Sequence, residues 1–231
     1  MNTYLHNPPQ FIPFFTGGVR GQKIFTFIIL FFLASAISAA TTTDSVALEN
    51  EFVKVMRQST IGFSANDTVF GTRVIVALTD TKIVSKKIKK TLTRGEVSVF
   101  EYNEKYKILD GDFFEVAFKR SHPAPKGPEE WLEPLKNKIV YEDAEFRIFE
   151  ERLEGGDTRE LHSHAQRVVI RLNEVQLTDP RFKPNGTPGG GIQVPNTVRF
   201  AEPMNHVVKN LSKIPLFNII IEFKYKKNEA S

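Results

Sequence analysis

The stretch RVIVALTD at residues 73–80 returns 94 positions later as RVVIRLNE at residues 167–174. The same offset relates EFVKV at residues 51–55 to EFRIF at residues 145–149. A single offset that joins two separate runs indicates an internal repeat, and a repeat changes the assignment of the whole fold. We therefore expect two homologous units of roughly 90 residues each.

Both units consist of short runs that are typical of β-strands. These runs are rich in β-branched and aromatic residues, as in EVSVF at residues 96–100 and TVRF at residues 197–200, and turn residues separate them. No run after residue 40 has the long 3.6-residue apolar period of a helix. All-β units of this size close as small barrels or jelly rolls, which limits exposed sheet edges.

A proline-rich segment separates the two units. It reads SHPAPKGP at residues 121–128, and proline cannot supply the N–H donors that a central strand needs. We therefore expect one barrel over residues 44–120, a linker over residues 121–138 and a second barrel over residues 139–227.

The first 40 residues have the layout of a secretory signal. Arg20 and Lys23 precede an apolar run of about ten residues, and small residues follow as far as Ala40. We expect cleavage near Ala39 or Ala40 and a secreted or periplasmic protein with no stable membrane span; an uncleaved anchor is the alternative. Without the leader, 29 Lys+Arg face 27 Asp+Glu, so the net charge falls from +4 to +2 and gives no support to a nucleic-acid partner.

The residue composition limits the chemistry that the protein can carry. The 231 residues are 41% hydrophobic and 25% charged, as in ordinary globular domains, so wholesale disorder is excluded. The cysteine count is 0, which excludes a disulfide framework, a thiolate nucleophile and an iron–sulfur site.

Three of the five histidines form a pattern that suits a metal site. His162 and His164 are two residues apart, so they project to one face if they lie on a strand, and His206 follows on a later strand. Imidazoles placed in this way can hold one divalent transition metal, and the pattern does not distinguish Fe, Zn, Mn, Ni and Cu. The alternative is a chance pair of histidines at a polar strand edge.

These residues resemble the metal motifs of the cupin superfamily, and the repeat resembles a bicupin, which carries two cupin barrels. Gly156, His162 and His164 match the first cupin motif, and His206 and Asn210 match the H-x3-N end of the second. The resemblance implies two tandem double-stranded β-helix (jelly-roll) barrels over residues 44–227. It also implies a degenerate N-terminal barrel and three histidine metal ligands in the C-terminal barrel.

The match fails at the position of the family's glutamate ligand. Valines occupy both residue 168 and residue 169. Gln166 could replace this ligand weakly, and Glu150 is a second candidate, either as a ligand or as a catalytic base. A solvated charge at the end of a strand is the alternative interpretation of Glu150.

Strand alternation assigns a direction to the side chains of the run at residues 167–172. Val168, Ile170 and Leu172 are apolar, and we expect them to face the interior of the barrel. Arg167 and Arg171 are then expected to face away from it.

The resemblance implies an exported metal-binding bicupin that acts on an unknown small molecule. A three-histidine site suits a dioxygenase or a lyase/isomerase with one divalent transition metal. The alternative is a non-catalytic cupin that binds a small molecule or a carbohydrate and keeps a structural or vestigial metal site. The sequence does not decide between an enzyme and a binding protein, and a homo-oligomer is compatible with either.

Overall fold

The protein is built from β-strands. A computed structural model describes residues 45–59, 63–65, 70–127, 131–178 and 191–224, and the predicted leader lies outside these ranges. The described residues form strands and connecting turns and contain no helix, which confirms the all-β prediction. Accordingly, this part of the chain has no helix that is long and apolar enough to cross a membrane.

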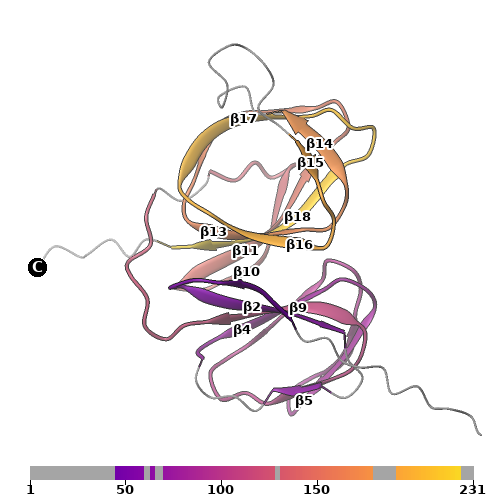
Figure 1. Ribbon diagram of the computed structural model, residues 1–231, viewed down its shortest axis with the longest axis vertical. Coiled ribbons are helices and arrows are strands. Elements are labelled where there is room, and N and C mark those ends of the chain that lie inside the picture. Colours follow the sequence, from indigo (N-terminus) through magenta and orange to yellow (C-terminus); the bar gives the residue numbers. More distant parts are fainter. Residues whose placement is uncertain (1–44, 60–62, 66–69, 128–130, 179–190, 225–231) are drawn as a thin grey trace, which may run out of the picture. The chain divides into compact units, whose positions relative to one another are not determined.

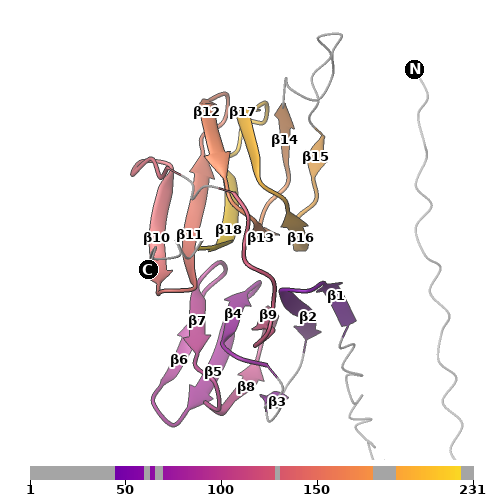
Figure 2. The ribbon, with the colours of Figure 1, turned by 90° about the vertical axis from the view of Figure 1, so that its left-hand side faces the viewer.

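The first half of the described chain forms two antiparallel sheets (Figure 2). One sheet has the strand order β1-β2-β9-β4-β7, and the other has the order β3-β8-β5-β6. The strands are β1 (Ser45–Glu49), β2 (Val53–Ser59), β3 (Phe63–Ala65), β4 (Arg73–Ala77), β5 (Thr81–Ser85), β6 (Lys89–Leu92), β7 (Val97–Phe100), β8 (Tyr106–Asp110) and β9 (Asp112–Phe118).

The second half also forms a five-stranded and a four-stranded antiparallel sheet. Their strand orders are β10-β11-β18-β13-β16 and β12-β17-β14-β15. The strands are β10 (Asn137–Glu142), β11 (Phe146–Leu153), β12 (Thr158–His164), β13 (Arg167–Arg171), β14 (Val175–Thr178), β15 (Ile192–Gln193), β16 (Thr197–Ala201), β17 (Met204–Asn210) and β18 (Leu216–Phe223).

The two halves share one topology. If β1 to β9 are matched in chain order to β10 to β18, the strand orders of both pairs of sheets coincide. The ladder registers agree as well, because Arg73 lies opposite Ala117 and Arg167 lies opposite Glu222 in equivalent strand pairs. The sequence repeat at residues 73–80 and 167–174 therefore corresponds to equivalent strands, β4 and β13. Within the described residues, no sheet closes on itself as a barrel.

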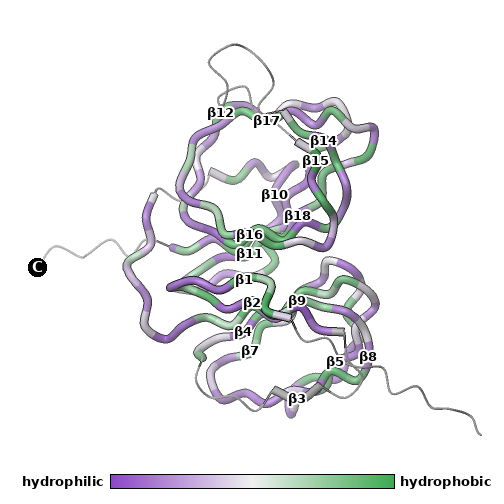
Figure 3. Tube along the Cα trace, in the orientation of Figure 1, coloured by the Kyte–Doolittle hydropathy of each residue, from purple (hydrophilic) through white to green (hydrophobic). Residues whose placement is uncertain are grey.

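One apolar core contains side chains from both five-stranded sheets. Figure 1 shows the two sheets facing each other, and Figure 3 shows hydrophobic residues along the strands that face. The Phe118 ring from the first half stacks on the Phe146 ring from the second, with 4.4 Å between centroids. Each fully buried aliphatic or aromatic side chain contributes roughly 1.5–3 kcal/mol. The fully buried aliphatic members from the central strands are Val53, Val55, Val74, Val76, Val116, Ile148, Val168, Ile170, Ile219 and Ile221.

The side chains of β13 face opposite directions to those predicted from sequence. Val168 and Ile170 belong to the core shared by the two halves, whereas Arg167, Val169 and Arg171 line a cavity within the second half. The prediction was wrong because it assumed that the more apolar row faces the barrel interior. In this protein the sheet is apolar on both faces, and the face that carries Val168 and Ile170 packs against the other half.

Candidate metal centre

Two neighbouring strands of the second half bring the three histidines together. Strand β12 pairs with β17 in a register that places His162 directly opposite His206 and His164 opposite Met204. His162 and His164 share a face of β12 because side chains alternate along a strand. All three rings are buried, with exposed fractions of 7%, 2% and 9% for His162, His164 and His206.

The three imidazoles present a compact set of nitrogen atoms. One ring nitrogen from each histidine lies within 4.8 Å of the other two, and the structure reveals no other such group of three metal-binding side chains in its described residues. Nε2 of His164 lies 2.9 Å from Nε2 of His206, so these two nitrogens share one proton in the metal-free protein. Three neutral nitrogen donors suit a divalent transition metal better than Ca²⁺ or Mg²⁺, which prefer oxygen ligands.

His162 is fixed in a form that can bind a metal. Its Nδ1 lies 2.7 Å from the backbone carbonyl oxygen of Glu160, to which it donates a hydrogen bond. Its Nε2 therefore carries the lone pair, and this atom is buried without a hydrogen-bond partner among the described residues. A buried polar atom without a partner is costly, and a metal ion at this position would satisfy it.

The surroundings of His162 and His164 favour the neutral form of these two rings. Burial lowers the pKa of His162, and the nearby positive charge of Arg159 lowers it further. Burial also lowers the pKa of His164 far below its ordinary value, with Arg167 and His162 as the next causes. Neutral imidazole is the form that binds metals, so at neutral pH neither ring starts as an imidazolium. The proton between His164 and His206 would still be displaced when a metal binds.

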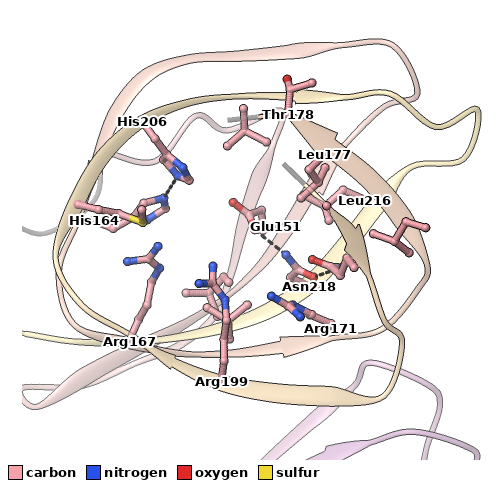
Figure 4. Close-up of a pocket in the computed structure, with 17 residues that line it drawn as sticks. Glu151, His164, Arg167, Arg171, Leu177, Thr178, Arg199, His206, Leu216 and Asn218 are labelled. Carbon is pink, nitrogen blue, oxygen red and sulfur yellow. Dashed lines mark hydrogen bonds between the residues drawn. The ribbon is translucent and has the colours of Figure 1, made fainter. Parts of the chain in front are cut away.

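A cavity of about 310 Å³ opens beside His164 and His206 (Figure 4). This volume is at the lower end of the range of about 300–1,000 Å³ that small-molecule sites occupy. The apolar part of its lining consists of Val169, Leu177, Ile192, Met204, Val208, Leu216 and Ile220.

Three arginines line the same cavity (Figure 4). Arg167 and Arg171 come from β13, and Arg199 comes from β16. Arg199 lies directly opposite Val169 in the ladder between these strands, so the three side chains share one face of the sheet. The expectation that Arg167 and Arg171 face away from the interior is therefore wrong. Arg199 was not predicted from the sequence, although it alternates with the apolar residues of its strand as Arg171 does.

The carboxylate in the cavity is Glu151, not the predicted Glu150. Burial raises the pKa of Glu151, but Arg159 and the Asn218 amide lower it by more, so the net shift is downward. Arg159 Nη1 donates to one carboxylate oxygen over 2.8 Å, and Asn218 Nδ2 donates to the other over 2.9 Å. Glu151 is thus ionised and fully engaged by its neighbours.

Glu150 lies at a second pocket, away from the histidines. That pocket is lined by residues from both halves, among them Lys90, Lys138 and Glu150. The carboxylate of Glu150 accepts a hydrogen bond from Arg152 Nε at 3.2 Å and pairs with Lys138 Nζ at 3.6 Å. The structure therefore does not bring Glu150 together with the three histidines.

Two other motif residues have structural partners. The side-chain oxygen of Gln166 accepts a hydrogen bond from the backbone N–H of Lys126, and its amide donates to Glu202. Gln166 is thus tied to the connecting segment and is not among the residues that line the cavity. Asn210 is 0% exposed, and its amide donates to the carbonyl oxygens of Leu153 and Ile214. It fastens the end of β17 to its neighbours.

The first half has a packed interior in the place of the histidine cluster. Its core includes the stacked rings of Phe100 and Tyr106, 4.2 Å apart between centroids. The Tyr106 hydroxyl donates to Glu115 at 2.7 Å, and Arg73 pairs with the same carboxylate at 3.5 Å. Residue 68, which the offset of 94 aligns with His162, lies outside the described residues.

Comparison with known proteins places the chain by its fold. No family model and no curated protein sequence matches it. A cupin 2 conserved barrel domain protein from Leptotrichia buccalis is similar in structure, with a TM-score of 0.54 and 14% identity over 80% of this chain and 90% of that one. AerE from Microcystis aeruginosa has a TM-score of 0.52 and 12% identity over 79% and 98%.

An IolB-like protein from Salmonella typhimurium is also similar, with a TM-score of 0.50 and 9% identity over 78% of this chain and 89% of that one. At such identities the likeness concerns the fold alone, and the fold is that of cupin proteins. The predicted resemblance is confirmed at this level.

Proposed function

We propose that the protein consists of two tandem cupin barrels, of which the second holds one divalent metal and acts on a small molecule. The observation that carries the proposal is the cluster of His162, His164 and His206, whose ligand atoms lie within 4.8 Å of one another beside a cavity. The equivalent strand order of the two halves supports the two-barrel arrangement. The reaction class that this site suits is that of a dioxygenase or a lyase/isomerase.

The donor set fits such a metal. The buried Nε2 of His162 has no hydrogen-bond partner in the described residues, and Nδ1 of the same ring donates a hydrogen bond to the carbonyl oxygen of Glu160. A hydrogen bond from the ring nitrogen that does not bind the metal orients the ligand histidines of metal sites. When bound, the ion would supply a Lewis acid that polarises an oxygen atom of a molecule in the cavity.

The residues around the histidines make the cavity suitable for binding a small molecule. The apolar wall, with Leu177, Val208 and Leu216, would accept the carbon skeleton of a ligand. Glu151 has a lowered pKa and is engaged by Arg159 and Asn218, so it is a weak base at neutral pH. Its role is structural, because its contacts with Arg159 and Asn218 hold this part of the cavity lining in place.

An enzyme is favoured over a structural metal site because the cluster borders open space. Structural metal sites are closed by protein ligands, whereas catalytic sites leave a position for water or substrate. In this protein three nitrogen ligands approach from β12 and β17, and the cavity lies against His164 and His206. A redox-active metal such as iron or copper in the purified protein would favour the dioxygenase.

Metal analysis of protein purified without an affinity tag tests the proposal. We expect about one transition-metal ion per chain, because the described residues contain one group of three such ligands. The double variant His162→Ala/His164→Ala should lose this ion, and His122→Ala is the matched control because His122 lies outside the cluster. Two ions per chain, or an undiminished metal content in the double variant, would contradict the proposed centre.

A further inference from the structure

Three arginines give the cavity of the second half a positively charged lining. The charged side chains that line it are Arg167, Arg171, Arg199 and Glu151. Glu151 is already neutralised by Arg159, which donates to it over 2.8 Å. The lining therefore carries an excess of positive charge from its three arginines.

Arg171 and Arg199 are placed to receive an anionic ligand. Both guanidinium groups point into the cavity (Figure 4). Within the described residues, neither forms a salt bridge, and Nε of Arg171 is buried without a hydrogen-bond partner. Burial lowers the pKa of Arg171, and the neighbouring charge of Arg199 lowers it further. An oxyanion between the two groups would relieve this repulsion.

The equivalent positions of the first half carry no such charges. Ala77 is equivalent to Arg171 in the repeat, and Ser98 is equivalent to Arg199, because Ser98 lies opposite Ile75 as Arg199 lies opposite Val169. The same topology is thus built with small, uncharged side chains at both places.

We infer that the cavity binds a small organic anion whose carboxylate or phosphate group is held by Arg171 and Arg199. Arginine suits both groups because its planar fork donates two parallel hydrogen bonds. The apolar wall formed by Leu177, Val208 and Leu216 receives the carbon skeleton of the ligand. The inference rests on the proposed function, since it names the class of molecule that the metal centre would act on.

Calorimetric titration of the purified protein with succinate, inorganic phosphate and the neutral analogue succinamide tests this inference. We expect an acid to bind and succinamide not to bind. Tighter binding of succinate would assign a carboxylate ligand, and tighter binding of phosphate would assign a phosphate ester. Arg171→Gln and Arg199→Gln should each weaken binding by roughly tenfold or more, as expected for the loss of a charge-assisted hydrogen bond.

Arg120→Gln is the matched control, because Arg120 is exposed and lies over the Tyr102 ring at 4.4 Å, outside the cavity lining. If Arg171→Gln fails to fold, Arg171→Lys keeps the charge but loses the fork, and it should still bind more weakly than the wild type. The inference is overturned if neither acid binds at millimolar concentration. It is also overturned if the cavity variants bind as tightly as Arg120→Gln.

Metal content measured on the same samples separates this inference from the proposed function. Arg171→Gln and Arg199→Gln should keep the wild-type metal content. Wild-type protein that binds the acid after treatment with EDTA but never holds a metal would refute the metal centre alone. Protein that holds one metal but binds no acid would refute the anion site alone.

Discussion

Introducing a glutamate at residue 168 or at residue 169 tests which face of β13 looks into the cavity. Val168 is 0% exposed and belongs to the apolar core shared by the two halves. Val169 is 3% exposed, but it lines the cavity on the same face as Arg171 and Arg199. The two substitutions are chemically identical and differ only in the face to which they send a carboxylate.

Val168→Glu should be severely destabilising. It removes the burial of a valine, worth roughly 1.5–3 kcal/mol, and it forces a larger side chain into a packed core, at about 1–3 kcal/mol. The carboxyl group would also have no polar partner in that cluster, so the total loss should exceed about 4 kcal/mol. This approaches the whole stability of a typical domain, about 5–15 kcal/mol.

Val169→Glu should be much milder, because its carboxylate would enter a cavity that already contains Arg171 and Arg199. We expect a loss of about 1–2 kcal/mol, since favourable charge contacts offset part of the lost burial. Urea unfolding followed by far-ultraviolet circular dichroism measures both losses. Val168→Leu and Val169→Leu control for size alone. If Val169→Glu is as destabilising as Val168→Glu or more so, the assignment of the two faces of β13 is refuted.

Three further predictions concern the turn after β17, the pH dependence of stability and the leader. Asn210→Ala should lower the free energy of unfolding by roughly 2–4 kcal/mol, because it leaves the carbonyl groups of Leu153 and Ile214 without their donor. The control is Asn205→Ala, at an exposed position, which should change the free energy of unfolding little in the same urea assay. The pKa values of His162 and His164 are lowered on folding from 6.5, so below that pH the unfolded chain binds more protons. The metal-free protein should therefore have its full stability above about pH 6.5 and lose stability as the pH falls. Thermal unfolding measured over this pH range should show a smaller loss of stability for His164→Gln than for the wild type. N-terminal sequencing of exported protein should begin near residue 40, and a membrane-bound product that retains residues 25–33 would show an anchor instead.

The sequence by itself determined the class of fold and the group of histidines. The all-β composition and the offset of 94 residues depend on local propensity and on repeated patterns, which are properties of the chain. The spacing of His162 and His164 fixed their common face, because alternation along a strand is a local rule. The structure brings both together with His206, which lies opposite His162 in the ladder between β12 and β17.

Only the tertiary structure decided which face of each strand looks into the cavity. Alternation separates Val168 from Val169 and Glu150 from Glu151, but it does not say which member of a pair faces the site. The five-stranded sheet of the second half has two covered faces. One face packs against the other half of the protein, and the other lines the cavity within the second half. Both faces therefore carry apolar side chains, and hydrophobicity alone cannot distinguish them. This is why the arginines of the cavity, and Glu151 rather than Glu150, became visible only in the folded protein.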